Sequence, residues 1–84
     1  MESQEIIETL KNLIEPYVQN IEAYKTLDQD TDFINDLGIN SANLVDVVLD
    51  IEDAFDIVID NDSMEKMLDV RSSLAVIQQK LAAK

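Results

Sequence analysis

The sequence contains no cysteine and no histidine among its 84 residues. Without them it cannot form disulfides, use a thiol or an imidazole in catalysis, or supply the commonest zinc ligands. Ser-His-Asp and Cys-His catalytic sites are therefore excluded. A chain of this length has room for one small core, which predicts a single domain over residues 1–84 and argues against a deep, preformed active site.

Signals for export and membrane insertion are also lacking. The first residues, MESQEII, do not combine a basic segment with the apolar segment of a signal peptide, and no apolar run approaches the roughly 18 residues that a membrane helix needs. We therefore expect a cytoplasmic protein without membrane insertion.

Positive charge is scarce, because 6 Lys and Arg stand against 18 Asp and Glu, for a net charge of −12. Residues 26–65 contain no basic residue and twelve acidic ones. Nucleic acid is disfavoured as a partner, since its binding requires a basic footprint. The acidic stretch is either an ordinary solvated surface or one that attracts a basic protein surface or divalent cations.

Apolar residues at spacings of three and four predict helices. Residues 4–18 and 41–55 each carry such a stripe. Asp62 and Glu65 resemble a capping box for a short helix over residues 62–68. Asp69 is a candidate N-cap for a last helix, whose apolar stripe is Val70, Leu74, Ile77 and Leu81. We therefore expect an all-α fold, a small four-helix bundle with three longer helices and a short third helix.

Residues 19–40 are predicted to form a long ordered loop between the first two helices, pinned by isolated apolar side chains. A loop this long is uncommon in a compact domain and favours a functional role. Aspartates alternate over residues 28–32 as in a calcium-binding loop. However, Phe33 stands where an EF-hand needs glycine and Ile39 where it needs glutamate, so we expect no specific metal site.

On a helix over residues 41–55, one side is acidic and lies opposite the apolar stripe. Asp46, Asp50 and Asp53 fall on this side, and so do Ala42 and Leu49. Single exposed leucines are common, but a leucine among carboxylates has no evident role in folding. The combination predicts a docking face with charges for steering and an apolar anchor for affinity.

Ser41 stands at the start of this helix, three residues after the only glycine, Gly38. An ordinary N-cap is the simplest interpretation of this serine. Asn40 is already a competent cap, however, and Gly38 allows a sharp turn. Because free backbone amides and the helix dipole favour an anion at a helix start, Ser41 is also a suitable attachment point for a phosphate.

The segment DLGINSANLVDVVLDIEDAFDIVI, residues 36–59, resembles the prosthetic-group segment of acyl carrier proteins. That segment reads Asp-Leu-Gly-x-Asp-Ser-Leu and continues into an acidic helix ending in Glu-Phe-Asp. The resemblance extends over essentially the whole chain. It implies a carrier, not an enzyme, in which a phosphopantetheinyl transferase uses coenzyme A and magnesium to attach 4′-phosphopantetheine to Ser41. The terminal thiol would carry acyl intermediates of fatty-acid, lipid or polyketide-type biosynthesis as thioesters.

The resemblance also implies which residues meet the partners and the cargo. Docking onto basic surfaces of acyl-transferring and acyl-modifying enzymes, such as ketosynthases, would use the acidic residues Asp46, Asp50, Glu52, Asp53, Asp56, Asp60 and Glu65. The acyl chain would enter the bundle between the apolar residues Val48, Ile51, Ile59 and Met67. We expect the carrier to be a monomer.

Two residues beside the serine depart from the family pattern. Asn40 stands where the family usually has aspartate, and Ala42 where it usually has leucine. These departures predict a specialised carrier with dedicated partners. Two alternatives stay open: a peptidyl or aryl carrier of the nonribosomal type, whose docking surface is usually less acidic, and an unmodified acidic interaction module in which Ser41 only caps a helix.

Overall fold

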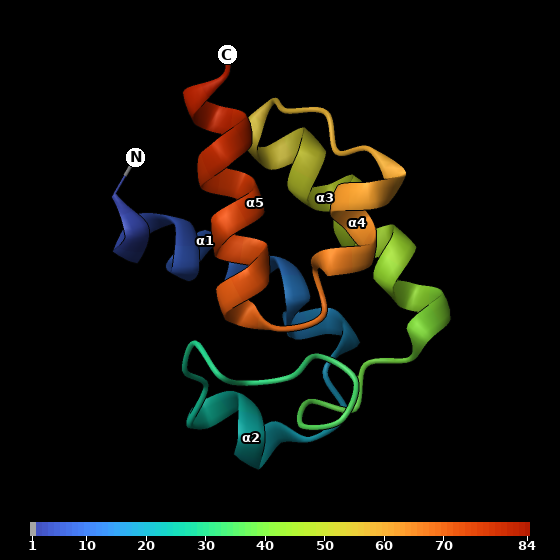
Figure 1. The fold of residues 1–84 in the computed structure, drawn as a ribbon. Coiled ribbons are helices and arrows are strands. Elements are labelled where there is room, and N and C mark those ends of the chain that lie inside the picture. The colour runs from blue at the N-terminus through green and yellow to red at the C-terminus, as the bar shows by residue number, and fades with distance from the viewer. Residues whose placement is uncertain (1) are drawn as a thin grey trace.

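A computed structural model describes residues 2–84, which form five α-helices (Figure 1). These are α1 (Ser3–Ile14), α2 (Ile21–Lys25), α3 (Leu44–Phe55), α4 (Asn61–Lys66) and α5 (Val70–Ala82), and short 3-10 turns follow α1 at Glu15–Tyr17 and precede α3 at Ser41–Asn43. The predicted all-α fold with a long loop between the first two long helices is confirmed. Within the described part of the chain, no helix is both long enough and apolar enough to span a membrane.

The three long helices meet along the stripes that the sequence predicted. The fully or nearly buried apolar side chains of this core are Ile6, Leu10 and Ile14 from α1, Val47, Val48, Ile51 and Phe55 from α3, and Val70, Leu74, Val76 and Ile77 from α5. Pro16 lies in the 3-10 turn directly after α1. Because proline lacks a backbone donor and its ring opposes α-helical continuation, α1 ends at Ile14, before the predicted residue 18.

Helix α2, in the long loop, was not predicted. It has only five residues and no buried side chain, so it lacks the apolar stripe from which helices are inferred. The Asn20 side chain caps it by accepting a hydrogen bond from the backbone N–H of Ala23 at 3.2 Å. In Figure 1, α2 and the loop around it cover the end of the bundle away from the C-terminus.

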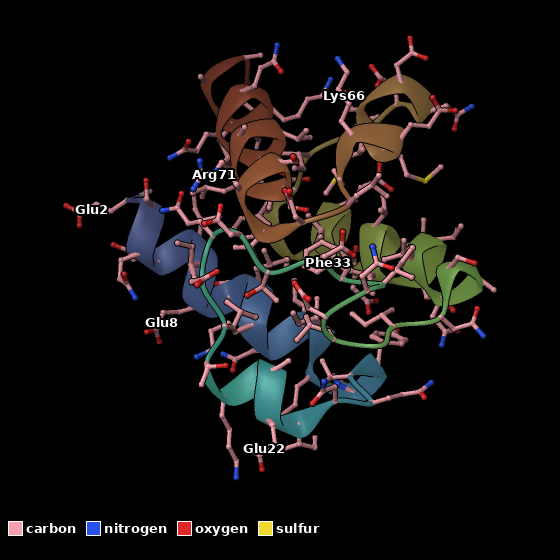
Figure 2. All side chains as sticks on the ribbon, turned by 60° about the horizontal axis from the view of Figure 1, so that its bottom comes forward. Glu2, Glu8, Glu22, Phe33, Lys66 and Arg71 are labelled. Carbon is pink, nitrogen blue, oxygen red and sulfur yellow. The ribbon has the colours of Figure 1, made fainter. Side chains whose placement is uncertain are left out.

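The long loop is held in place by buried side chains and by the link between α4 and α5. Phe33 points between the helices, whereas Glu8, Glu22 and Lys66 project outward (Figure 2). Three backbone hydrogen bonds join the loop to this link and to the start of α5: Phe33 N–H to Leu68 O at 3.0 Å, Val70 N–H to Thr31 O at 3.1 Å, and Arg71 N–H to Gln29 O at 2.9 Å. These contacts confirm the prediction that the long loop is ordered.

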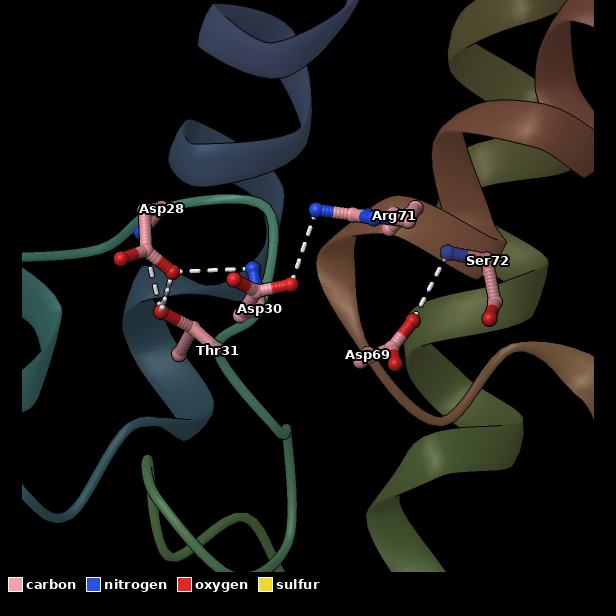
Figure 3. A network of polar contacts seen from close by, with 6 residues as sticks. All are labelled: Asp28, Asp30, Thr31, Asp69, Arg71 and Ser72. Carbon is pink, nitrogen blue, oxygen red and sulfur yellow. Dashed lines mark hydrogen bonds and ion pairs between the residues drawn. The ribbon is translucent and has the colours of Figure 1, made fainter.

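Side chains around this junction reinforce the backbone contacts. In Figure 3, Thr31 bonds to Asp28 inside the loop, and Arg71 lies 2.9 Å from Asp30 across the junction. Asp69 accepts a hydrogen bond from the N–H of Ser72 at 2.7 Å, which confirms its predicted role as the N-cap of the last helix.

The predicted start of the short third helix is wrong. Its N-cap is Asp60, which accepts a hydrogen bond from the N–H of Ser63 at 2.7 Å, and α4 runs from Asn61 to Lys66. Asp62 lies in the first turn instead of capping it. Ile57 is buried in the segment between α3 and α4, and the turn into α4 begins two residues earlier than the Asp62–Glu65 pattern indicated.

Candidate functional site

Ser41 lies where the long loop enters the 3-10 turn that leads into α3. The preceding turn depends on Gly38, whose φ of +71° is a conformation that other residues rarely adopt. The carbonyl of Leu37 anchors this turn by accepting hydrogen bonds from the N–H groups of Gln19 and Asn20, both at 3.0 Å. Because Ile39 is then buried, the chain emerges from the core just before Ser41, which is exposed.

Asn40, and not Ser41, caps the turn. The Oδ1 atom of Asn40 accepts a hydrogen bond from Ala42 N–H at 2.9 Å, and its carbonyl accepts one from Asn43 N–H at 2.8 Å. The hydroxyl of Ser41 makes no hydrogen bond within residues 2–84. Its side chain is therefore accessible and free of a structural task, which excludes the interpretation of Ser41 as a simple cap.

The backbone amides after Ser41 are already engaged, contrary to the expectation that free amides would receive a phosphate. The N–H groups of Ala42 and Asn43 bond to Asn40, and that of Leu44 bonds to the carbonyl of Ser41. A phosphate on Ser41 would gain from the positive end of α3 without a cradle made by these amides. Such a site suits a group held by a covalent bond.

The seven acidic residues expected to dock partners differ in their surroundings. Asp46, Asp53 and Glu65 are exposed. Asp50 is half-buried and accepts a hydrogen bond from the Tyr17 hydroxyl at 3.1 Å. Glu52 is also half-buried and accepts one from Ile59 N–H at 2.8 Å, so that it ties the segment after α3 back to the helix.

Asp56 and Asp60 are exposed acids with local structural tasks. Asp56 ends α3 in a left-handed conformation, and its Oδ2 lies 3.4 Å from Nζ of Lys84. Asp60 caps α4, and its Oδ2 lies 3.5 Å from Nζ of Lys80. The hydrogen bonds from Ser63 lower the pKa of the Asp60 carboxyl, and the charge of Lys80 adds to this effect. Their negative charge is therefore partly balanced within the chain.

Apolar side chains accompany these acids on the exposed side of α3. Leu49 is 55% exposed, as its position on the acidic side of the helix predicted, and Ala42 is exposed as well. Val45, at 49% exposure, lies one turn before Leu49 and was missed. The spacing of four residues between Val45 and Leu49 was the available signal, since it places both on one helix face.

The residues expected to receive an acyl chain are in the interior. Val48, Ile51 and Met67 belong to the buried core, and Ile59 packs against it half-buried. Two open hollows, of about 420 Å³ beside α2 and about 330 Å³ between α1 and α5, are lined by other residues. An acyl chain would therefore enter only if these four side chains separate.

Carboxylates do not assemble into a metal site in residues 2–84, where no group of three or more is placed to hold one ion. The aspartates over residues 28–32 serve the loop itself. Asp28 bonds to Thr31 and to the N–H of Asp30, and Asp32 accepts from the N–H groups of Ile34 and Asn35.

The helical fold and the free serine before α3 agree with comparisons to known proteins. A family model described as a phosphopantetheine attachment site matches residues 16–77, which is most of the chain. The fold and this match define a phosphopantetheine-binding carrier domain.

Curated relatives identify the kind of carrier. An acyl carrier protein of Guillardia theta is 35% identical over 83 residues, covering 99% of this chain and 100% of that protein. Another, of Desulforapulum autotrophicum, is 32% identical over 71 residues, 84% of this chain and 91% of that protein. A third, of Coprothermobacter proteolyticus, is 29% identical over the full length of both chains. The chain belongs to the acyl carrier protein family, and it is a non-catalytic carrier of phosphopantetheine-linked acyl groups.

Proposed function

We propose that Ser41 is the residue that receives the 4′-phosphopantetheine. The proposal rests on one observation, the separate roles of Asn40 and Ser41 at the start of α3. Asn40 supplies the cap, so the Ser41 hydroxyl is left exposed and without a hydrogen bond in the described residues. Replacement of its proton by a phosphodiester would cost the fold no internal contact.

The attachment reaction uses the Ser41 oxygen as the nucleophile. An O–P bond forms to the pantetheine phosphate of coenzyme A, the bond to 3′,5′-ADP breaks, and the serine proton leaves to a base of the transferase. The arm supplies the thiol for thioester formation, which this chain lacks because it has no cysteine.

The exposed side of α3 is proposed to dock the partner enzymes. Asp46 and Asp53 are exposed, and Glu65 on α4 extends the same negative charge. These acids would attract basic surfaces of the transferase and of acyl-modifying enzymes such as ketosynthases, with Leu49 as an apolar anchor. Asp50, Glu52, Asp56 and Asp60 contribute charge while also holding the fold.

The interior of the bundle is proposed to shelter the cargo between Val48, Ile51, Ile59 and Met67. All four are apolar and belong to the core or pack against it. Methionine is suited to such a site, because its unbranched side chain repacks easily. Since the neighbours of Ser41 are Asn40 and Ala42, we further propose a specialised, monomeric carrier that works in the cytoplasm with dedicated partners.

Intact mass spectrometry tests the attachment site. The apo protein is incubated with coenzyme A, magnesium and a broad-specificity transferase, and the wild type should gain the mass of one phosphopantetheine. Ser41→Ala should gain none, whereas the matched variant Ser72→Ala, at a serine on α5, should be modified like the wild type. An unmodified wild type, or a modified Ser41→Ala protein, would overturn the assignment.

A further inference from the structure

Ser73, on α5, has a hydroxyl group buried in the bundle without a partner. The residue has 0% exposure, and its Oγ finds no hydrogen bond within residues 2–84. Thr31, the other buried polar residue of the described part of the chain, is paired as is usual, since its Oγ1 accepts a hydrogen bond from Asp28 N–H at 2.9 Å. An unpaired buried hydroxyl is destabilising and calls for an explanation.

The neighbours of α5 show which way Ser73 faces. Lys80 follows Ser73 by seven residues and so lies within about 20° of it around the helix, whereas Gln78 lies about 140° away. Lys80 pairs with Asp60, the N-cap of α4, and Gln78 bonds to Ser3 of α1 at 2.8 Å. Ser73 therefore faces the side of the interior that belongs to α4 and not the side that belongs to α1.

The same side of the interior contains part of the proposed acyl site. Ile59 directly precedes the α4 cap, and Met67 directly follows the last residue of α4. Met67 is buried in the core, and Ile59 packs against it. The Ser73 hydroxyl is thus a buried polar group on the side of α5 that faces α4, and the bundle would have to open on this side to admit an acyl chain.

We infer that Ser73 is a specificity-determining residue for acyl groups that carry oxygen, such as 3-hydroxyacyl and 3-oxoacyl chains. This inference rests on the proposed function of Ser41 and of the interior site. A serine hydroxyl both donates and accepts, so it pairs equally with a hydroxyl or a carbonyl of the cargo. A saturated chain leaves the hydroxyl unpaired, and the carrier therefore discriminates between the two classes.

The test compares Ser73→Ala with Ser72→Ala, a matched serine variant one residue earlier on α5 that is only half-buried. Each protein is prepared unloaded and with octanoyl or 3-hydroxyoctanoyl pantetheine attached through hydrolysis-resistant amides. Mass spectrometry confirms loading, and thermal unfolding gives the melting temperature of each form.

We expect the 3-hydroxyoctanoyl form of the wild type and of Ser72→Ala to melt above the octanoyl form by about 4 °C, the shift expected for one added hydrogen bond in a domain of this size. In Ser73→Ala the order should reverse, and the unloaded variant should melt above the unloaded wild type because the unpaired hydroxyl is gone.

Three results would overturn the inference: no advantage of the 3-hydroxy cargo in the wild type, the same advantage in Ser73→Ala, or a lower melting temperature of unloaded Ser73→Ala. The last result would show that the hydroxyl pairs within the fold, for example with the carbonyl of Asp69 one turn earlier. Failure of loading would instead contradict the proposed function of Ser41, and the mass spectrum identifies that case directly.

Discussion

The hydroxyl of Tyr17 donates a hydrogen bond to Oδ2 of Asp50 at 3.1 Å, and this contact ties the turn after α1 to the acidic side of α3. The bond raises the pKa of the Tyr17 hydroxyl above its ordinary value of 10.0, with burial and the negative charges of Asp50 and Asp46 adding to the rise. Helix α3, which carries the proposed docking acids, is thus coupled to the Tyr17 hydroxyl, a group that titrates in the alkaline range.

This coupling predicts a change in the titration of Tyr17. In a Tyr24→Phe background, which removes the other tyrosine, Asp50→Asn should bring the pKa of Tyr17 back towards its ordinary value, as measured by phenolate absorbance. Because the folded-state pKa is raised, the stability from this bond is fully present below the ordinary pKa and is lost as the pH rises through the folded-state value. Asp53→Asn, which removes an exposed acid of the same helix, should change the titration less. Equal effects of the two variants would contradict a specific bond.

The cap of α4 predicts a loss of stability in acid. The pKa of Asp60 is lowered, chiefly by the hydrogen bonds from Ser63. The corresponding stability is therefore present above the ordinary pKa of 3.8 and is lost as the pH falls through the folded-state value. Asp60→Asn should melt below Asp62→Asn at pH 7, and this difference should shrink as the pH falls below 3.8. A difference that persists in acid would show that the charge of Asp60 is not its cause.

The positive φ of Gly38 predicts the effect of a single methyl group. Gly38→Ala should lower the free energy of unfolding by about 1–2 kcal/mol, because an L-residue is strained in this conformation. The added Cβ would also lie 3.3 Å from Cβ of Gln19. Urea unfolding measures the loss. A chemically synthesised chain with D-alanine at residue 38, which accepts this φ, should unfold at a higher urea concentration than the L-alanine variant, and the reverse order would exclude backbone strain as the cause.

The two residues that flank Ser41 predict a change in partner choice. Asn40→Asp keeps a competent cap and adds a carboxylate, and Ala42→Leu adds an exposed apolar contact. Together they should raise kcat/KM for modification by a generic transferase by about tenfold, equivalent to roughly 1.4 kcal/mol of added transition-state binding. The contribution of Asn40→Asp should weaken with salt, whereas that of Ala42→Leu should not. If the double variant is modified at the wild-type rate, these neighbours do not make the carrier selective.

The longer helices could be predicted because their apolar stripes are continuous, whereas α2 could not, since none of its five residues is buried. Asp69 was identified as a cap because a stripe begins directly after it. Asp60 was not identified because Asp62 and Glu65 offered an equally good local pattern, and the choice between them depends on how the segment after α3 packs, with Ile57 buried and Ile59 N–H bonded to Glu52.

At the attachment site, the residue types and their order were sufficient to select Ser41 and to identify Asn40 as a competent cap. The engagement of the following amides depends on the 3-10 geometry of Ser41–Asn43, which the sequence pattern does not specify. The isolation of Ser73 depends on the packing of α5 against elements distant in the sequence. Periodicity placed the stripe of Val70, Leu74 and Ile77 but did not reveal that the serine beside it is equally buried.

The hydrogen bonds between residues 29–33 and residues 68–71 have a consequence for the synthesis of the protein. The loop that leads to Ser41 acquires its final contacts only when the chain has been made to residue 71, some thirty residues beyond the serine. During translation, the attachment site is therefore assembled late, when the last helix begins to emerge from the ribosome. A transferase that requires these contacts would therefore act on Ser41 only after the chain has been made beyond residue 71.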